Sequence, residues 1–381
     1  MAENSSEILP ERSGTSAEKV ARRGLACQDK VGAGSVRDAR GVQVAARAGR
    51  VTIVDVARAA GTSVSSASVA LRGEPGVSEE TRRRILRTAD RLGYRPDQRA
   101  RMLREQNSRL LGVTFTVSQA FHAEVVEHLY RAVADTGYDL VLSATTRTRT
   151  ELQAVESLLQ ERCAALVLVS PDIGNHDLAA LSRRVPAVTV GSELHAESVD
   201  SVRADDRRGV GAAVEHLVAA GHRDIHYVDG GRAVMSRTRR EGYLDAMSAH
   251  GLADRARVLG GHADEESGVA AAMELLAAAR PPTAVLTHND MTAFGLLLTL
   301  RVRGVDVPGE ISVVGYDDTR LASLRNVELT SVSQDPAALA ATAVRRAVAR
   351  CEGQEVPAGE FVTPPRLVVR TSSGPPRRIS R

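Results

Sequence analysis

Several side chains that could bind a ligand follow runs of β-branched and aliphatic residues, either just past the run or in the helix after it. They combine an arginine, two carboxylates, an amide, an imidazole and an aromatic ring, and are Phe121, His122, Asp205, Arg239, Asn289 and Asp317. The polar members present fixed donors or acceptors to hydroxyls or ring nitrogens, which suits a polyhydroxyl or heterocyclic ligand. Two further acids at such places, Asp206 and Asp318, we interpret as helix caps or surface charges.

The sequence lacks the arrangements that are typical of catalysis. Its histidines are scattered, no Gly-x-Ser-x-Gly motif occurs, and no spacing suits a metal. Cys27, Cys163 and Cys351 are few and far apart, which fits reduced thiols. We therefore expect no enzyme activity, no catalytic residue, no cofactor and no metal.

The ligand-binding candidates depend on an alternation of strands and helices from Leu110 onward. Strand-like runs occur at 111–116, 140–142, 165–169, 187–190, 225–228, 284–287 and 311–314, with helices between them such as 214–220, 243–250 and 269–279. This alternation predicts parallel sheets with helices on both faces. Roughly 270 residues are too many for one such sheet, so we expect two lobes. Ligands bind beyond the carboxyl ends of parallel strands, where the six candidates lie.

Before this region, residues 52–71 have the pattern of two short helices joined by a tight turn. Thr52 and Asp55 form a capping-box start, Gly61 ends the first helix, and Ser63 can cap the second. In the second helix we expect an inward face and a small exposed face. The inward residues are Val64, Ala67, Ala70 and Leu71, and the exposed ones are Ser65, Ser66 and Val69. A helix with such short exposed side chains can approach a DNA major groove closely.

A third helix, with Ile85, Leu86, Ala89 and Leu92 inward, is predicted between Ser78 and Gly93. Its expected exposed face consists of arginines, at positions 82, 83, 84, 87 and 91. Residues 51–104 contain eleven Arg against six Asp and Glu, a net charge of +5, whereas residues 105–381 come to −5. Positive charge concentrated on small helices is typical of phosphate binding.

These residues resemble the LacI family of bacterial transcription regulators. The matching features are the opening at 51–57, the turn after it, the run at 77–82, and the segments 92–96 and 100–103. The resemblance implies an all-α helix-turn-helix DNA-binding domain followed by a two-lobed α/β effector domain that is similar to periplasmic binding proteins. It implies a DNA-contacting set at Thr52, Ser63, Val64, Ser65, Ser66, Val69, Arg72, Tyr94, Ala100, Arg101 and Leu103.

In the family the second helix reads bases, and the segment after Pro96 becomes a hinge helix on operator DNA, with Leu103 as a minor-groove wedge. One departure concerns Val69, where many relatives carry Arg or His. Valine cannot form a bidentate bond to guanine, although it can contact a thymine methyl. The operator sequence is therefore left open.

The resemblance also bears on the ligand. Arg239 and Asp317 match effector-binding positions of sugar- and purine-responsive members, and Phe121, His122 and Asn289 lie at commonly used contact positions. The chain has no Trp, and Ala263 lies near where relatives place a stacking aromatic. Sugar and purine thus both stay open, with carbohydrate favoured.

The predicted organisation is a disordered tail or mis-called start at 1–50, a DNA-binding domain at 51–95, a hinge at 96–108, an effector-binding and dimerisation domain at 109–374, and a disordered tail at 375–381. Neither a secretory signal nor a run of apolar residues long enough to cross a membrane is present, so we expect a cytoplasmic protein. The expected partners are a pseudo-palindromic operator in double-stranded DNA, a small-molecule effector and a second copy of the chain. The alternative is a solute-binding protein with the same cleft fold.

Overall fold

The computed structural model describes residues 51–94, 108–194, 196–354 and 356–377. They fall into two compact units, one within Met1–Gln98 and the other within Arg99–Arg381. The predicted tail at 1–50, most of the predicted hinge and the last four residues lie outside the described ranges.

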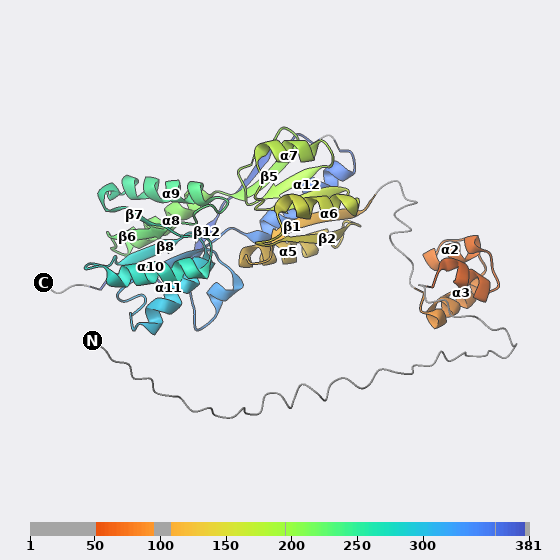
Figure 1. The fold of residues 1–381 in the computed structure, drawn as a ribbon, viewed down its shortest axis with the longest axis horizontal. Helices are drawn as coiled ribbons and strands as arrows, with labels where there is room; N and C mark the ends of the chain where they lie inside the picture. The colour runs from red at the N-terminus through yellow and green to blue at the C-terminus, as the bar shows by residue number, and fades with distance from the viewer. Residues whose placement is uncertain (1–50, 95–107, 195, 355, 378–381) are drawn as a thin grey trace, which may run out of the picture. The chain divides into compact units, whose positions relative to one another are not determined.

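The first unit consists of three helices, α1 (Ile53–Ala59), α2 (Val64–Arg72) and α3 (Glu79–Leu92); Figure 1 labels α2 and α3. Each helix starts at a hydroxyl cap. Thr52 and Asp55 form the predicted capping box, and the Ser63 hydroxyl accepts the amide of Ser66 at 3.0 Å. Gly61 follows α1 with φ of 61°, a left-handed conformation that a glycine adopts without steric cost.

The helices of this unit pack around a small aliphatic core made of Val56, Ala57, Ala60, Ala67, Ala70, Ile85 and Ala89. Two inward predictions are wrong, because Val64 and Leu86 are each 41% exposed. Val64 lies in the first turn of α2, one turn before the buried Ala67. Leu86 is one residue past Ile85 on α3 and is therefore turned about 100° away from the buried stripe.

One arginine of α3 was also wrongly expected on the exposed face. The Arg82 side chain is only 17% exposed, and its Nη2 donates to the Glu74 carbonyl oxygen at 2.5 Å. This hydrogen bond of Arg82 connects α3 to the turn after α2. The other four arginines of that face, Arg83, Arg84, Arg87 and Arg91, are exposed as predicted.

The second unit has two lobes, each built on one six-stranded sheet (Figure 1). The first sheet has the order β11-β5-β4-β3-β1-β2, and all its strands are parallel. These strands are β1 (Leu110–Thr116), β2 (Asp139–Thr145), β3 (Ala165–Val169), β4 (Ala187–Val190), β5 (Val199–Ala204) and β11 (Glu360–Thr363). Its helices are α5 (Ala120–Val133), α6 (Glu151–Gln160), α7 (Asn175–Ser182) and α12 (Pro336–Cys351). Buried residues of α5 and α12 pack on one face of the sheet, and those of α6 and α7 pack on the other.

The second sheet has the order β12-β10-β9-β8-β6-β7. Its strands are β6 (Ile225–Val228), β7 (Arg257–Leu259), β8 (Ala284–Thr287), β9 (Ser312–Asp317), β10 (Thr330–Ser333) and β12 (Arg366–Val368). Its helices are α8 (Asp206–Ala219), α9 (Ser236–Ala249), α10 (Glu265–Ala277) and α11 (Asp290–Val302), and two 3-10 turns lie at Ala253–Arg255 and Arg320–Ser323. Helices α8 and α9 cover one face, whereas α10 and α11 cover the other.

The chain passes between the lobes three times, from β5 to α8, from β10 to α12 and from β11 to β12. The two-lobed, helix-covered architecture predicted from the alternation of strands and helices is therefore confirmed. The parallel prediction fails at β12, which pairs antiparallel with β10. In the segment predicted as a disordered C-terminal tail, the described part has a defined contact, because Arg377 forms an ion pair with Glu310 at 3.4 Å.

Candidate ligand cleft and nucleic-acid interface

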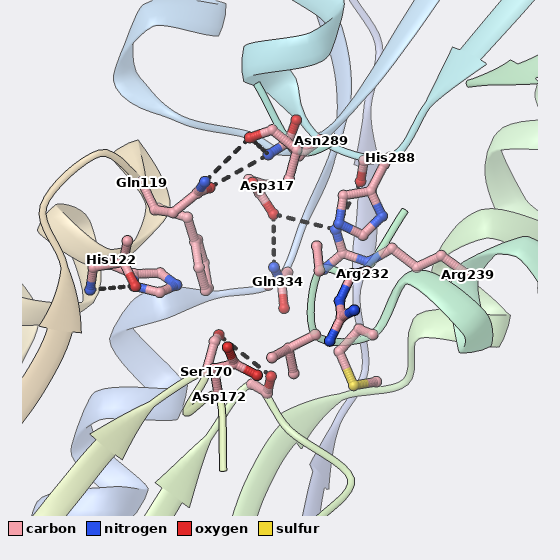
Figure 2. Close-up of a pocket in the computed structure, with 17 residues that line it drawn as sticks. Gln119, His122, Ser170, Asp172, Arg232, Arg239, His288, Asn289, Asp317 and Gln334 are labelled. Carbon is pink, nitrogen blue, oxygen red and sulfur yellow. Dashed lines mark hydrogen bonds and ion pairs between the residues drawn. The ribbon is translucent and has the colours of Figure 1, made fainter. Parts of the chain in front are cut away.

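A cavity of about 200 Å³ lies between the two lobes of the second unit. Its walls come from the carboxyl ends of strands in both sheets and from the first turns of α5 and α9. Figure 2 shows the side chains that converge on it. The lining residues are Thr116, Gln119, Phe121, His122, Ser170, Asp172, Gly191, Arg232, Ala233, Val234, Met235, Arg239, Ala263, His288, Asn289, Asp317 and Gln334.

Arg239, in the first turn of α9, is the most constrained of these side chains. It is 5% exposed, and its Nε donates to Asp206 Oδ1 at 2.5 Å while its Nη1 donates to the carbonyl oxygen of His288 at 2.7 Å. The guanidinium lies over the Tyr316 ring, 3.8 Å from its centroid. Burial opposes its charge, but the carboxylate of Asp206 raises the pKa of Arg239, so the group stays cationic. The guanidinium is thus held in place by groups of the protein itself.

The interpretation of Asp206 as a cap or surface charge is wrong. Its side chain is 1% exposed and is the main ionic partner of Arg239. The capping role belongs to its neighbour Asp205, which accepts the amide of Arg208 at 3.1 Å. Asp205 does not line the cavity, although the sequence placed it in the ligand set. Asp205 is the N-cap of α8, so its carboxylate stays at the start of the helix. Asp206 is the first helical residue, and its carboxylate is buried in the lobe.

Asp317 ends β9 and lines the cavity beside Arg239. Its Oδ1 accepts Gln334 Nε2 at 2.7 Å and lies 3.7 Å from Arg239 Nη1, and Figure 2 shows the bond to Gln334 as a dashed line. Its φ of 111° is unusual for an aspartate, and such backbone strain is often found at ligand sites. Burial raises the pKa of its carboxyl, and nearby Asp290 adds to this although Arg239 opposes it. The Asp317 carboxyl therefore accepts a proton more readily than an exposed aspartate does.

Asn289 and Gln119 face each other across the cleft from different lobes. Gln119 Nε2 donates to the Ala263 carbonyl oxygen at 3.1 Å, and Asn289 Nδ2 lies 3.5 Å from Gln119 Oε1. Asn289 also caps α11, since its Oδ1 accepts the amide of Thr292 at 3.0 Å. These amides connect the lobes directly, so a ligand that competes for them would alter the contact between lobes.

His122 and Phe121 begin α5 and line the other wall. The Thr116 amide donates to His122 Nδ1 at 3.0 Å, which leaves the proton of the neutral ring on Nε2. Burial lowers the pKa of His122 to about 4, so the ring is a neutral donor at pH 7. Phe121 meets the imidazole edge to face at 6.5 Å between centroids and belongs mainly to the lobe core.

Five of the six predicted ligand residues line the cavity, and Asp205 does not. Ser170 and Asp172 were missed, although they follow the predicted strand β3 and the same strand-end rule applies to them. Gln334 follows β10, a four-residue strand that the pattern analysis did not find. Arg232 lies in the loop after Gly231, and Gln119 precedes α5, where no sequence signal marks either residue.

The residues expected to contact DNA have different surroundings in the first unit. Val64 and Ser65 are exposed at the start of α2, whereas Val69 is half-buried. Thr52 and Ser63 serve as helix caps, and the half-buried Tyr94 packs against the core. Arg72 lies at the end of α2, where its Nε donates to Glu74 Oε1 at 2.6 Å. Ala100, Arg101 and Leu103 lie outside the described residues.

The described residues form no helix that is both long and apolar enough to cross a membrane. Within the same ranges, no group of three or more His, Cys, Asp or Glu side chains is placed to hold a metal ion.

Two stretches of the chain match known protein families. Residues 52–97 match the family described as "Bacterial regulatory proteins, lacI family", and residues 214–373 match the periplasmic binding protein-like domain. The HTH-type transcriptional regulator GalR of Escherichia coli (strain K12) is 34% identical over 330 residues, which span 85% of this chain and 96% of GalR.

Solved structures agree with this assignment. The lac repressor dimer bound to operator and the anti-inducer ONPF is 28% identical, covers 86% of this chain and 100% of its own, and superposes with a TM-score of 0.73. The complex of the transcriptional regulator CelR with cellobiose is 27% identical, covers 85% of this chain and 100% of its own, and gives a TM-score of 0.62. The protein is a DNA-binding transcription regulator with an effector-binding fold. It belongs to the LacI family.

Proposed function

We propose that the cleft binds a small carbohydrate and that its occupancy controls the affinity of the protein for an operator. The supporting observation is the composition of the cavity wall, where amides, hydroxyls, a neutral imidazole and carboxylates from both lobes face one space. Paired donors and acceptors of this kind suit vicinal hydroxyls. The volume of about 200 Å³ lies below the range of about 300–1,000 Å³ found for drug-sized ligands, which favours a monosaccharide-sized effector.

The lobes are the elements through which the effector would act. Between the lobes Gln119 bonds across to Ala263, and the Thr238 hydroxyl donates to Glu193 of the other lobe at 2.7 Å. An effector that bonds the same groups stabilises one arrangement of the lobes over another. Only a ligand with different affinities for the two arrangements can shift the population between them. The related CelR binds cellobiose in the same fold, which supports a sugar as the effector class.

On the DNA side we propose a homodimer that binds a pseudo-palindromic operator, with the two copies of α2 in major grooves about 34 Å apart. The exposed arginines of the first unit supply phosphate contacts, and Ala100, Arg101 and Leu103 supply the hinge contacts. The lac repressor dimer bound to operator, a similar protein, supports this arrangement. A protein that binds chromosomal operators acts in the bacterial cytoplasm.

The test is the affinity of the full chain for DNA selected from a random duplex library, measured with and without a panel of monosaccharides. Asp172→Asn changes an exposed cavity carboxylate, and Asp135→Asn is a matched control on an exposed carboxylate outside the cavity. We expect one sugar to change operator affinity at least tenfold, in the wild type and in the control but not in Asp172→Asn. A panel without effect would reject the carbohydrate proposal, and equal responses in both variants would reject the cleft as its site.

A further inference from the structure

The charged groups of the cavity wall are unevenly distributed between the two lobes. Arg232, Arg239 and His288 of the second lobe lie on one side of the cavity, and His122 of the first lobe lies on the other (Figure 2). Arg239 already has the Asp206 carboxylate as its ionic partner. Of the three second-lobe side chains, Arg232 and His288 are thus the ones that remain open to a ligand.

Arg232 is a cation of the cavity wall without a counter-ion from the protein. It is exposed, and within the described residues its guanidinium forms neither a hydrogen bond nor an ion pair. Asp229, the nearest acid in the sequence, accepts Arg240 Nη1 at 3.0 Å, and Asp317 accepts Gln334 Nε2 at 2.7 Å. A guanidinium has parallel N–H donors that match the oxygens of a carboxylate or a phosphate. Arg232 can therefore bind an anionic group in the cavity.

His288, the first residue after β8, lies under the loop that carries Arg232. A Cβ on Gly230 would be 2.4 Å from the Cγ of His288, so the loop rests directly on the ring. His288 is 3% exposed, and its Nδ1 has no hydrogen-bond partner in the described part of the chain. Burial and the charge of Arg239 lower the pKa of His288, so the ring is neutral and keeps one N–H donor. Buried polar atoms normally have partners, and this imidazole therefore marks a place for a polar group of the ligand.

The first lobe contributes the opposite charge to the cavity. Asp172 comes shortly after β3, is exposed, and has no ion pair among the residues that the structure describes. Its carboxylate can accept hydrogen bonds from sugar hydroxyls. A ligand with an anionic group at one end and hydroxyls at the other therefore complements both lobes. An amino sugar would instead place a cation on Asp172, and the test includes this alternative.

We propose that the effector is an anionic monosaccharide, with its carboxylate or phosphate bound to Arg232 and His288 and its hydroxyls facing Asp172. This inference rests on the proposed binding of a carbohydrate in the cleft and specifies the class of that carbohydrate. Sugar acids and sugar phosphates present the same charge to Arg232, and the experiment distinguishes them.

The experiment is isothermal titration calorimetry of the full chain with matched sets of sugars. Each hexose or pentose is compared with its uronic and aldonic acids, its phosphates and its amino sugar. We expect one acid or phosphate to bind at least about tenfold more tightly than its neutral parent, which is the worth of a hydrogen bond to a charged group. Its affinity should fall with rising salt, because ions screen the charge of an exposed arginine. The better ligand of the two anionic kinds identifies the group as carboxylate or phosphate.

Arg232→Gln is the decisive variant, and it should bring the affinity for the anionic sugar to within about threefold of that for the neutral parent. Arg237→Gln is the matched control and should keep the full preference, because Arg237 lies on α9 outside the cavity wall with a side chain that is 75% exposed. Both arginines are exposed, and circular dichroism verifies that each variant keeps its fold.

Two sets of results would contradict the inference in different ways. A neutral or amino sugar that binds at least as tightly as the anionic one overturns it and leaves the carbohydrate proposal intact. An anionic preference that survives Arg232→Gln does the same. If no sugar binds, the carbohydrate proposal itself is overturned, and the inference with it.

Discussion

Replacing His122 with asparagine should remove part of the acid sensitivity of the second unit. In the folded protein burial lowers the pKa of His122 to about 4, compared with the ordinary value of 6.5. Between these values the unfolded chain binds the proton more tightly, so protonation favours unfolding. The contribution to stability is complete above about pH 6.5 and is lost as the pH falls toward 4.

The size of the effect follows from the two pKa values. At pH 5.0 the unfolded imidazole is almost fully protonated and the buried ring is about one-tenth protonated, which corresponds to a loss of about 2 kcal/mol relative to pH 7.5. In His122→Asn the amide oxygen can accept the Thr116 amide in place of Nδ1, without titrating. The other histidines contribute equally to both proteins and cancel in the comparison.

The assay is urea unfolding at pH 7.5 and 5.0, followed by circular dichroism because the chain has no Trp. We expect wild type to lose about 2 kcal/mol more than His122→Asn between the two pH values. His176→Asn, at an exposed position on α7, serves as the control and should behave as wild type. If wild type and His122→Asn lose the same stability, burial does not hold the imidazole neutral and Nε2 is not a fixed neutral donor.

Three further variants test other parts of the structure. Gly295→Ala should destabilise the second unit by at least about 3 kcal/mol in urea unfolding, because a Cβ there would overlap the Glu265 backbone where α10 and α11 cross; a loss below 1 kcal/mol would contradict so close a crossing. Asp200→Asn should cost about 3 kcal/mol by the same measurement, since it leaves two partly buried arginines that bond this fully buried carboxylate without their partner; an unchanged midpoint would show that the pairs add nothing. Glu74→Gln should steepen the salt dependence of DNA binding by up to about 0.9 in log–log slope, because Arg72 then becomes available to a phosphate; an unchanged slope would place Arg72 away from the DNA backbone.

The DNA-binding unit could be predicted closely from the sequence because its signals are local. Thr52, Ser63 and Gly61 act within one turn of the chain, and such caps need no information about distant residues. The wrong predictions concern side chains whose exposure depends on contacts with a neighbouring helix or turn. Val64 has the spacing of an inward residue but lies in the first turn of α2, and Arg82 finds a carbonyl acceptor in the turn after that helix.

The position of the ligand cleft could be predicted from the sequence, but only some of the residues that line it could. The strand-end rule located Asn289, which comes shortly after β8, and Asp317, which ends β9, and it placed Arg239 in the helix that follows β6. It could not separate Asp205 from Asp206, because the choice between capping and ion pairing depends on where Arg239 arrives from another helix. Gln119 and Arg232 depend on the approach of the lobes, which no local pattern encodes.

The three passages of the chain between the lobes constrain the order in which the protein can mature. The first lobe opens at Leu110 but is completed by α12 and β11, so its sheet lacks an edge strand until Thr363 has left the ribosome. Until α12 has been made, Ala165–Val169 and its neighbours lack the helix that covers one of their faces. A nascent chain that stalls before residue 336 therefore exposes apolar residues on that face of the sheet, which makes late truncations candidates for chaperone capture or degradation. The second lobe depends on β12, which comes later still, so neither lobe can finish long before the other and the cleft between them forms near the end of synthesis.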